Sequence, residues 1–131
     1  HGHDVGDQVL KKVATVLTRV RKGGKVYRYG GEEFAILFPD KEADDVFDHL
    51  DELRATVAGE KFFIRSSPSK AARKKTAAKK KASSSSNALK ITISIGLASP
   101  KSNFDSTDEV IKAADKALYR AKKAGRNQVK K

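Results

Sequence analysis

The sequence predicts an α+β domain in which helices pack around a mainly antiparallel central sheet. Apolar residues recur at helical spacing in three segments, two strand-forming runs flank a double glycine, and a longer run alternates large apolar residues with smaller ones. Hairpins that alternate with helices are typical of α+β domains. At 131 residues, the chain has the length of a single domain.

The expected order is helix, hairpin, helix, strand, insertion, strand, helix and strand. The first helix covers 5–20 and is ended by Gly23-Gly24, the hairpin strands are 25–29 and 34–38, and the second helix, 43–57, is closed by Gly59. The later elements are strands at 61–64 and 89–98, a helix from a capping box at 106–109 to Gly125, and a strand at 127–129. The residues of the last helix expected to face the core are Val110, Ile111, Ala114, Ala117, Leu118 and Ala121.

Several classes of protein are excluded by composition. The chain has no cysteine, so it carries neither a disulfide framework nor a thiolate site. No apolar run reaches the roughly 20 residues of a membrane span, and no signal peptide opens the chain, so we expect a cytoplasmic protein. His1 and His3 lie at the N-terminal end and His49 on the polar side of the second helix, and none has a partner at metal-ligand spacing.

The net charge of +12 is concentrated in one segment. Residues 65–88 hold eight lysines and arginines and no acid, so the rest of the chain carries only +4. With almost no large apolar side chain, residues 66–88 are interpreted as a disordered insertion. Such a tract can attract phosphate backbones or anionic surfaces, but the missing aromatic residues argue against specific binding of single-stranded nucleic acid.

The hairpin turn, Gly30-Gly31-Glu32-Glu33, is the first candidate for chemistry. Mg²⁺ is typically held by one or two carboxylates together with substrate phosphates. Glycines beside the carboxylates let a nucleotide approach the backbone closely. The alternative interpretation is an exposed acidic hairpin tip without a ligand.

Two basic residues near the end of the last helix are the second candidate. Lys122 and Arg126 are four residues apart, with Gly125 between them. Basic residues are favoured at a helix C-terminus by the helix dipole alone, so their position is also explained without a ligand. A phosphate-binding role requires both to converge on the acidic turn, which spacing cannot show.

Four segments together resemble the GGDEF family of diguanylate cyclases. "RYGGEEF" (28–34) is a variant of the signature that names the family, with GGEEF at Gly30–Phe34. "GHDVGDQVL" (2–10), "ITISIGLA" (91–98) and "ADKALYRAKKAGRNQV" (114–129) are similar to three further family motifs, in the same order. The motifs span the chain outside the basic insertion, so the whole of 1–131 is identified as a GGDEF domain.

The resemblance implies a fold and an activity. The fold is the palm of nucleotide cyclases, which is ferredoxin-like, and the activity is the Mg²⁺- or Mn²⁺-dependent condensation of two GTP into cyclic di-guanylate and pyrophosphate. Glu32 is then a metal carboxylate and Glu33 a catalytic neighbour, while Gly30 and Gly31 make room for the nucleotide.

The resemblance also implies substrate contacts and partners. Asp7 matches the residue that hydrogen-bonds the guanine edge, and Lys122 and Arg126 match contacts to the triphosphate. Each subunit binds one GTP, so catalysis requires a homodimer in which two sites meet. A regulatory module is expected before the domain.

Two departures from the family pattern modify these expectations. The family's strand before the G-H-x-x-G-D motif, which carries another metal-binding aspartate, is absent, so the chain is expected to be an N-terminally truncated and impaired catalyst. The product-inhibition motif R-x-x-D is represented by Arg21 with Gly24 in place of aspartate. Glycine has no side-chain acceptor, so this inhibitory site is expected to be degenerate.

Two other functions remain open from the sequence. A non-catalytic module could bind GTP or cyclic di-guanylate as a receptor, and turnover distinguishes it from the enzyme. A basic-loop protein could bind nucleic acid or an anionic membrane, and salt-dependent retention with and without residues 65–88 distinguishes that function.

Overall fold

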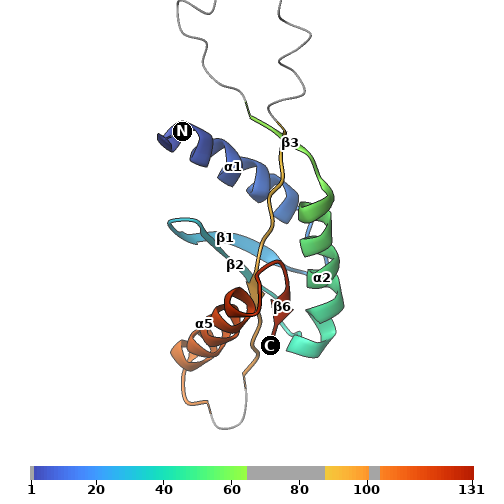
Figure 1. Cartoon of the computed structure of the whole chain (residues 1–131). Coiled ribbons are helices and arrows are strands. Elements are labelled where there is room, and N and C mark those ends of the chain that lie inside the picture. Colours follow the sequence, from blue (N-terminus) through green and yellow to red (C-terminus); the bar gives the residue numbers. More distant parts are fainter. Residues whose placement is uncertain (1, 65–87, 101–103) are drawn as a thin grey trace, which may run out of the picture.

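The structure, a computed structural model, describes residues 2–64, 88–100 and 104–131 and confirms the α+β class (Figure 1). The predicted insertion at 66–88 lies outside the described residues, except that Ala88 is the first residue of a strand. The elements are α1 (Gly2–Leu17), β1 (Lys25–Gly30), β2 (Glu33–Leu37), α2 (Ala43–Gly59), β3 (Phe62–Phe63), β4 (Ala88–Leu89), β5 (Ile95–Gly96), α5 (Thr107–Lys123) and β6 (Val129–Lys130).

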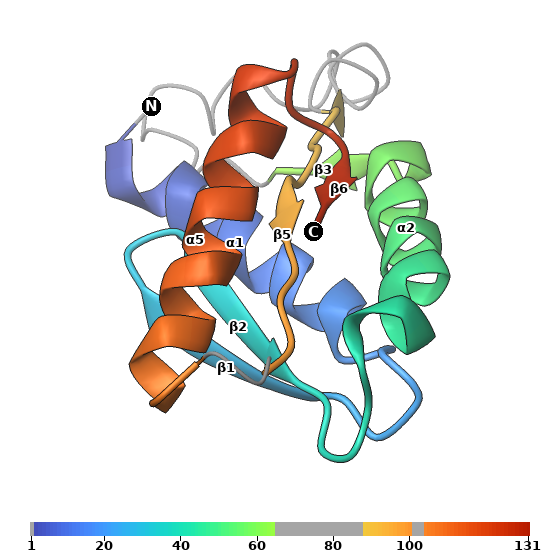
Figure 2. The same cartoon turned by 90° about the horizontal axis from the view of Figure 1, so that it is seen from below.

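The core lies between α1, α2 and the strands, because each helix carries an apolar stripe at a spacing of three and four residues. Val16 of α1 and Val57 of α2 are almost fully buried. Figure 2 shows β5 and β6 between α5 on one side and α2 on the other. The buried residues of this core are Val13, Val16, Leu17, Val46, Leu50, Leu53, Val57, Phe62 and Val129.

The predicted hairpin is present as β1 and β2, which pair in antiparallel register. Tyr27 lies opposite Ala35 and Arg28 opposite Phe34, and the register shifts between Arg28 and Gly30. An extra residue in one strand bends a hairpin and re-aims its tip. The irregularity therefore falls directly before the glycine-acid turn.

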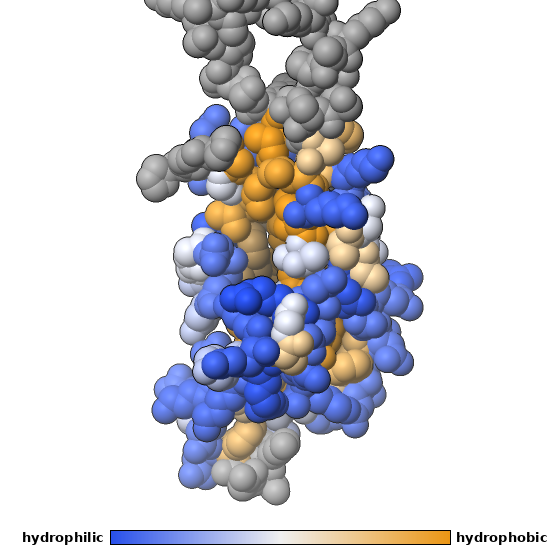
Figure 3. Space-filling view, viewed as in Figure 1, coloured by the Kyte–Doolittle hydropathy of each residue, from blue (hydrophilic) through white to orange (hydrophobic). Residues whose placement is uncertain are grey.

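The strands of the expected mainly antiparallel central sheet form three two-stranded sheets. The strand expected at 89–98 is divided: β4 pairs antiparallel with β3, whereas β5 pairs parallel with β6. Among the described residues, no strand pairs with 90–94, although Ile91 and Ile93 pack against the core. Figure 3 shows apolar residues gathered where this segment runs between α1 and α2.

Helix α5 lies close to β5 because Gly96 has no side chain. A Cβ built at Gly96 would lie 2.1 Å from the carbonyl oxygen of Ala114 and 2.3 Å from the nitrogen of Leu118. The small residues Ala117 and Ala121 are the fully buried part of the helix. Ile111, which was expected to face the core, is 37% exposed, because this contact turns α5 toward β5 on its alanine face.

Helices α2 and α5 begin where predicted, but their capping contacts differ from those expected. Ser106 is the N-cap of α5, but its side chain makes no capping hydrogen bond. The carboxylate of Glu109 instead accepts a hydrogen bond from the backbone N–H of Asp105, so the predicted capping box is displaced by one residue. At α2, the Glu42 N–H donates to Asp45 Oδ2 at 2.8 Å, one half of a capping box that the sequence analysis did not identify.

His49 is buried, and its prediction as a residue of the polar helix face was wrong. The loop after α1 folds over α2, and the Arg21 N–H donates to His49 Nε2 at 2.9 Å. Nδ1 is buried and has no hydrogen-bond partner in the described part of the chain. Desolvation lowers the pKa of His49 below its usual 6.5, and the nearby charge of Arg21 lowers that pKa further.

None of the helices that the structure describes is both long and apolar enough to cross a membrane.

Substitution of Gly96 by alanine should destabilise the fold, because the added carbon meets backbone atoms that cannot rotate away. We expect Gly96→Ala to lower the free energy of unfolding by at least about 1–3 kcal/mol, the range for overpacking. The control is Gly59→Ala in α2, where an added Cβ meets nothing within 4 Å. Urea unfolding should leave this control unchanged or raise its stability by up to about 1 kcal/mol. Equal stability of both variants would contradict the close contact.

The buried imidazole should make stability depend on pH. Because the folded state lowers the pKa of His49, its contribution is complete above the unfolded pKa of about 6.5 and is lost as the pH falls toward the folded pKa. The free energy of unfolding should fall between about pH 7.5 and 5.5, by at most about 1.4 kcal/mol per pH unit from this group.

The matched variant is His49→Gln, whose amide oxygen can accept the Arg21 N–H but does not titrate. Urea titrations across this range should show a shallower pH dependence for the variant than for the unsubstituted protein. The same slope in both proteins would show that His49 is not responsible.

Candidate functional site

The turn between β1 and β2 depends on the backbone of its two glycines. Gly30 has φ +156° and Gly31 has φ +53°, conformations that residues with a side chain rarely adopt. A Cβ added at either position would meet no atom within 4 Å. The glycines are therefore required by backbone conformation, and the space beside them is open.

Glu32 and Glu33 follow the glycines and are both exposed. In the part of the chain that the structure describes, neither carboxylate has a hydrogen-bond or ion-pair partner. No group of three or more histidine, cysteine or acidic residues able to hold a metal was found among the described residues. Two exposed carboxylates fit a hard cation that takes its remaining ligands from water and substrate phosphates.

Arg28 supports the turn, and the sequence analysis did not identify it. Its guanidinium Nη2 donates to the carbonyl oxygen of Gly31, and its Cζ lies 5.7 Å from the centre of the Phe34 ring. The side chain thus closes the loop from β1 onto the first residues of β2. An arginine two residues before a Gly-Gly pair is the signal that could have indicated this contact.

Asp7 lies in α1 and is exposed. Figures 1 and 2 both place the N-terminal half of α1 and the tip of the β1–β2 hairpin on the same side of the molecule. The tertiary structure therefore brings the predicted guanine-reading residue to the side that carries the two glutamates.

Lys122 and Arg126 flank the C-terminal end of α5. The Arg126 N–H donates to the Ala121 carbonyl at 2.9 Å and the Gly125 N–H to that of Lys122 at 3.4 Å, the two bonds of a Schellman motif. Gly125 has φ +118°, so the predicted glycine cap is confirmed. No described hydrogen bond or ion pair joins these basic side chains to the glutamates of the turn.

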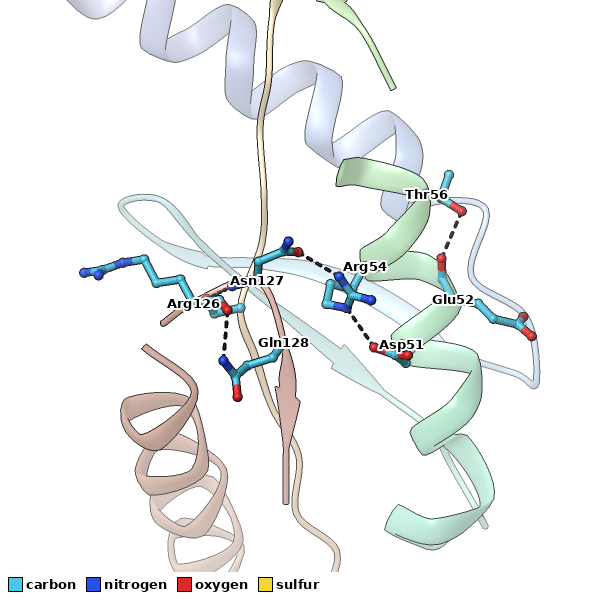
Figure 4. Close-up of polar contacts among 8 residues, drawn as sticks. Asp51, Glu52, Arg54, Thr56, Arg126, Asn127 and Gln128 are labelled. Carbon is cyan, nitrogen blue, oxygen red and sulfur yellow. Dashed lines mark hydrogen bonds and ion pairs between the residues drawn. The ribbon is translucent and has the colours of Figure 1, made fainter. Parts of the chain in front are cut away.

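The loop after α5 is fastened to α2 by a contact that sequence reasoning missed. Arg54 Nη1 donates to Asn127 Oδ1 at 2.8 Å, and Arg54 Nε pairs with Asp51 Oδ1 at 2.7 Å (Figure 4). The Asn127 N–H donates to Ser94 Oγ at 3.2 Å. Residues 73 positions apart cannot be paired from spacing, so no sequence signal indicated this contact.

Arg21 and Gly24, predicted to be the remains of an inhibitory site, lie in the loop between α1 and β1. The Arg21 side chain is 75% exposed and lies 3.7 Å from Glu52. A Cβ at Gly24 would lie 2.7 Å from the Phe38 ring and 2.9 Å from Val20 Cγ2. Packing therefore disfavours a larger residue at Gly24.

A cavity of about 640 Å³ lies away from these residues, between the start of α2, residues 97–99 and α5. Its walls carry charges of both signs, with acids on α2 and basic residues on α5 and at the C-terminal end. None of the site residues predicted from the sequence lines it. The residues that do are Glu42, Ala43, Asp44, Leu97, Ala98, Ser99, Phe104, Ala113, Lys116, Arg120 and Lys131.

Comparison with known proteins identifies the family. The family described as "Diguanylate cyclase, GGDEF domain" matches residues 1–69 and 59–128. The chain therefore belongs to the GGDEF family, as its four motifs predicted.

Curated relatives and solved structures agree with this assignment. The chain is 33% identical over 129 residues to the response regulator PleD of Caulobacter vibrioides, and 37% identical over 130 residues to the diguanylate cyclase DgcM of Escherichia coli K12. Both alignments cover 98% of this chain but only 24% and 26% of the relatives. The chain thus spans about a quarter of the length of these relatives.

Two solved domains share the fold. The GGDEF domain of DgcB from Caulobacter crescentus, solved in complex with c-di-GMP, superimposes with a TM-score of 0.75 at 34% identity, covering 98% of this chain and 64% of that one. The active GGEEF domain of a diguanylate cyclase from Vibrio cholerae gives 0.72 at 26% identity, covering 98% and 69%. The second carries in its signature the same glutamate variant as Glu32.

Proposed function

We propose that the chain is the nucleotidyl-transfer domain of a diguanylate cyclase, which condenses two GTP into cyclic di-guanylate and releases two pyrophosphates. The observation that carries the proposal is the turn itself, where the exposed Glu32 and Glu33 follow two glycines beside open space and have no partner among the described residues. A plain hairpin needs the glycines but not the adjacent acids.

Glu32 is proposed to hold Mg²⁺ or Mn²⁺, with Glu33 beside it, because carboxylate oxygens suit hard cations. When bound, the cation supplies charge stabilisation at the phosphoryl oxygens. Arg28 keeps the turn in shape by its hydrogen bond to the Gly31 carbonyl, and Gly30 leaves the backbone accessible to the nucleotide.

The substrate contacts are distributed over two helices. Lys122 and Arg126 are proposed to bind the triphosphate, for which positive charge at an exposed helix end is suited. Asp7 is proposed to accept hydrogen bonds from the guanine edge, a contact that adenine cannot donate in the same pattern. Two domains, each with one GTP, then meet as a homodimer, and control would come from a regulatory module outside the chain. We place this activity in the cytoplasm, where GTP is available.

Product inhibition should be weak in this protein. Arg21 is exposed and available, but Gly24 offers no side-chain acceptor, and Phe38 occupies the space that a larger residue would need. A binding site built on an Arg–Asp pair would therefore lose one of its two partners.

One observation favours the receptor alternative. The described residues hold two carboxylates at the turn and no third ligand group. A domain that binds GTP or cyclic di-guanylate without a complete metal site would bind and not turn over. Nucleotide binding without synthesis by the full-length protein would support this second function.

Replacement of the metal carboxylate tests the enzyme directly. In the full-length protein, Glu32→Gln should lower the rate of cyclic di-guanylate synthesis by at least roughly 100-fold, comparable to the loss of one electrostatic stabiliser in other active sites. Chromatography of the product and pyrophosphate release measure the rate. The matched control is Glu52→Gln, since Glu52 is an exposed acid in α2 whose contact with Arg21 is 3.7 Å long. A near-normal rate of synthesis by Glu32→Gln would contradict the assignment of Glu32 as a metal ligand.

Calorimetric titration with GTP, ATP and guanosine separates phosphate contacts from base contacts. Arg126→Ala should weaken GTP binding about tenfold, or roughly 1.4 kcal/mol, and guanosine binding hardly at all. The GTP loss should shrink as salt rises.

Asp7→Ala should do the reverse, weakening guanosine and removing the preference for GTP over ATP. Lys112 is an exposed lysine elsewhere on α5, so Lys112→Ala serves as the charge control. This variant should change the affinity for neither GTP nor guanosine. If Arg126→Ala lost equal affinity for GTP and for guanosine, Arg126 would not be a contact of the triphosphate.

A further inference from the structure

Arg126 and Asn127 form a short segment of left-handed backbone that needs support. Their φ angles are +64° and +48°, values that residues with a side chain adopt only at a cost in free energy. The cost falls mainly on Arg126, because asparagine adopts left-handed backbone more readily than most residues, so Arg126 must be held in place by its surroundings.

Three side chains supply that support, and Figure 4 shows two of them, Gln128 and Arg54. Gln128 Nε2 donates to the Arg126 carbonyl at 3.0 Å, and Ser94 Oγ accepts the Asn127 N–H at 3.2 Å. Arg54 donates to the Asn127 side chain at 2.8 Å. The Arg54 contact is the one charge-assisted hydrogen bond of the three, and the Arg54 side chain is only 18% exposed.

Arg54 is itself oriented by its own helix. Its Nε donates to Asp51 Oδ1 at 2.7 Å, one turn earlier in α2. One nitrogen of the planar guanidinium thus bonds to Asp51 within α2, and another bonds to Asn127 in the loop after α5. In Figure 4, Arg54 approaches Asn127 from one side and the Arg126 side chain extends from the other side, away from α2.

We propose that Arg54 is a positioning residue for the nucleotide site, which acts through Asn127 to hold the left-handed Arg126–Asn127 pair and so aims Arg126 at the triphosphate. This inference rests on the proposed phosphate contact of Arg126 and adds a residue that does not itself touch the substrate. Without the Arg54 contact, the pair would relax toward ordinary backbone angles and Arg126 would sample several directions.

A double-mutant cycle tests the coupling. The variants are Arg54→Met, Arg126→Ala and the double variant, and the ligands are GTP and guanosine. Arg54→Met alone should weaken GTP binding about fivefold and leave guanosine binding unchanged. In the Arg126→Ala background, Arg54→Met should have no further effect, because the group that it positions is gone.

Two further variants control for a general loss of stability. Arg19→Met removes an arginine from a 2.8 Å ion pair with Glu60, away from the loop, and should not change GTP affinity. Arg54→Lys keeps the charge and the stem but not the two-nitrogen fork, and should repeat the Arg54→Met pattern with a smaller loss. This second variant keeps the test valid if Arg54→Met unfolds.

Amide hydrogen exchange gives a readout that does not depend on nucleotide. Exchange at Asn127 should become about tenfold faster in Arg54→Met, while exchange at Ala121 inside α5 stays unchanged. Unchanged exchange at Asn127, or an equal loss of GTP affinity in both backgrounds, would overturn the positioning role. If Arg126→Ala does not weaken GTP at all, the phosphate contact itself is wrong and the positioning role falls with it, whatever the exchange result.

Discussion

The close approach of α5 to β5 is the contact on which the arrangement of the site depends. Gly96 leaves the space that the backbone of α5 occupies, and Ala117 and Ala121 complete the contact. Because α5 lies there, its C-terminal end reaches β6, which pairs with β5 through Ile95. The loop between α5 and β6 carries Arg126. The absence of a side chain at Gly96 therefore determines where the proposed basic part of the site lies.

The acidic part of the site follows a different physical principle. The β1–β2 turn is local, exposed and determined by two glycines and one arginine contact. Its carboxylates have no partner in the described structure, and so they remain available for a cation. No described hydrogen bond or ion pair joins the hairpin tip to the C-terminal end of α5. The proposed site therefore requires the fold to bring these two oppositely charged parts to one shared ligand.

The link between α2 and the loop after α5 gives that arrangement its stiffness. The Arg54–Asn127 contact joins two segments that share no local sequence relation. His49, also in α2, has a comparable role, because it accepts the Arg21 N–H and anchors the loop between α1 and β1. In both places a polar side chain of α2 is hydrogen-bonded to a loop that carries a predicted site residue.

The sequence by itself determined the family, the α+β class, the hairpin and the three helices, because hydrophobic periodicity, glycine turns and family motifs are local signals. It also indicated Glu32, Asp7 and Arg126 as candidates, whose roles remain predictions. Only the tertiary structure decided that the strand expected at 89–98 divides between two partners, that His49 is buried, and that Arg54 holds Asn127. These features depend on which segments, far apart in the sequence, come into contact in the fold. Such contacts are determined by packing between helices and strands, which no local pattern of residues encodes.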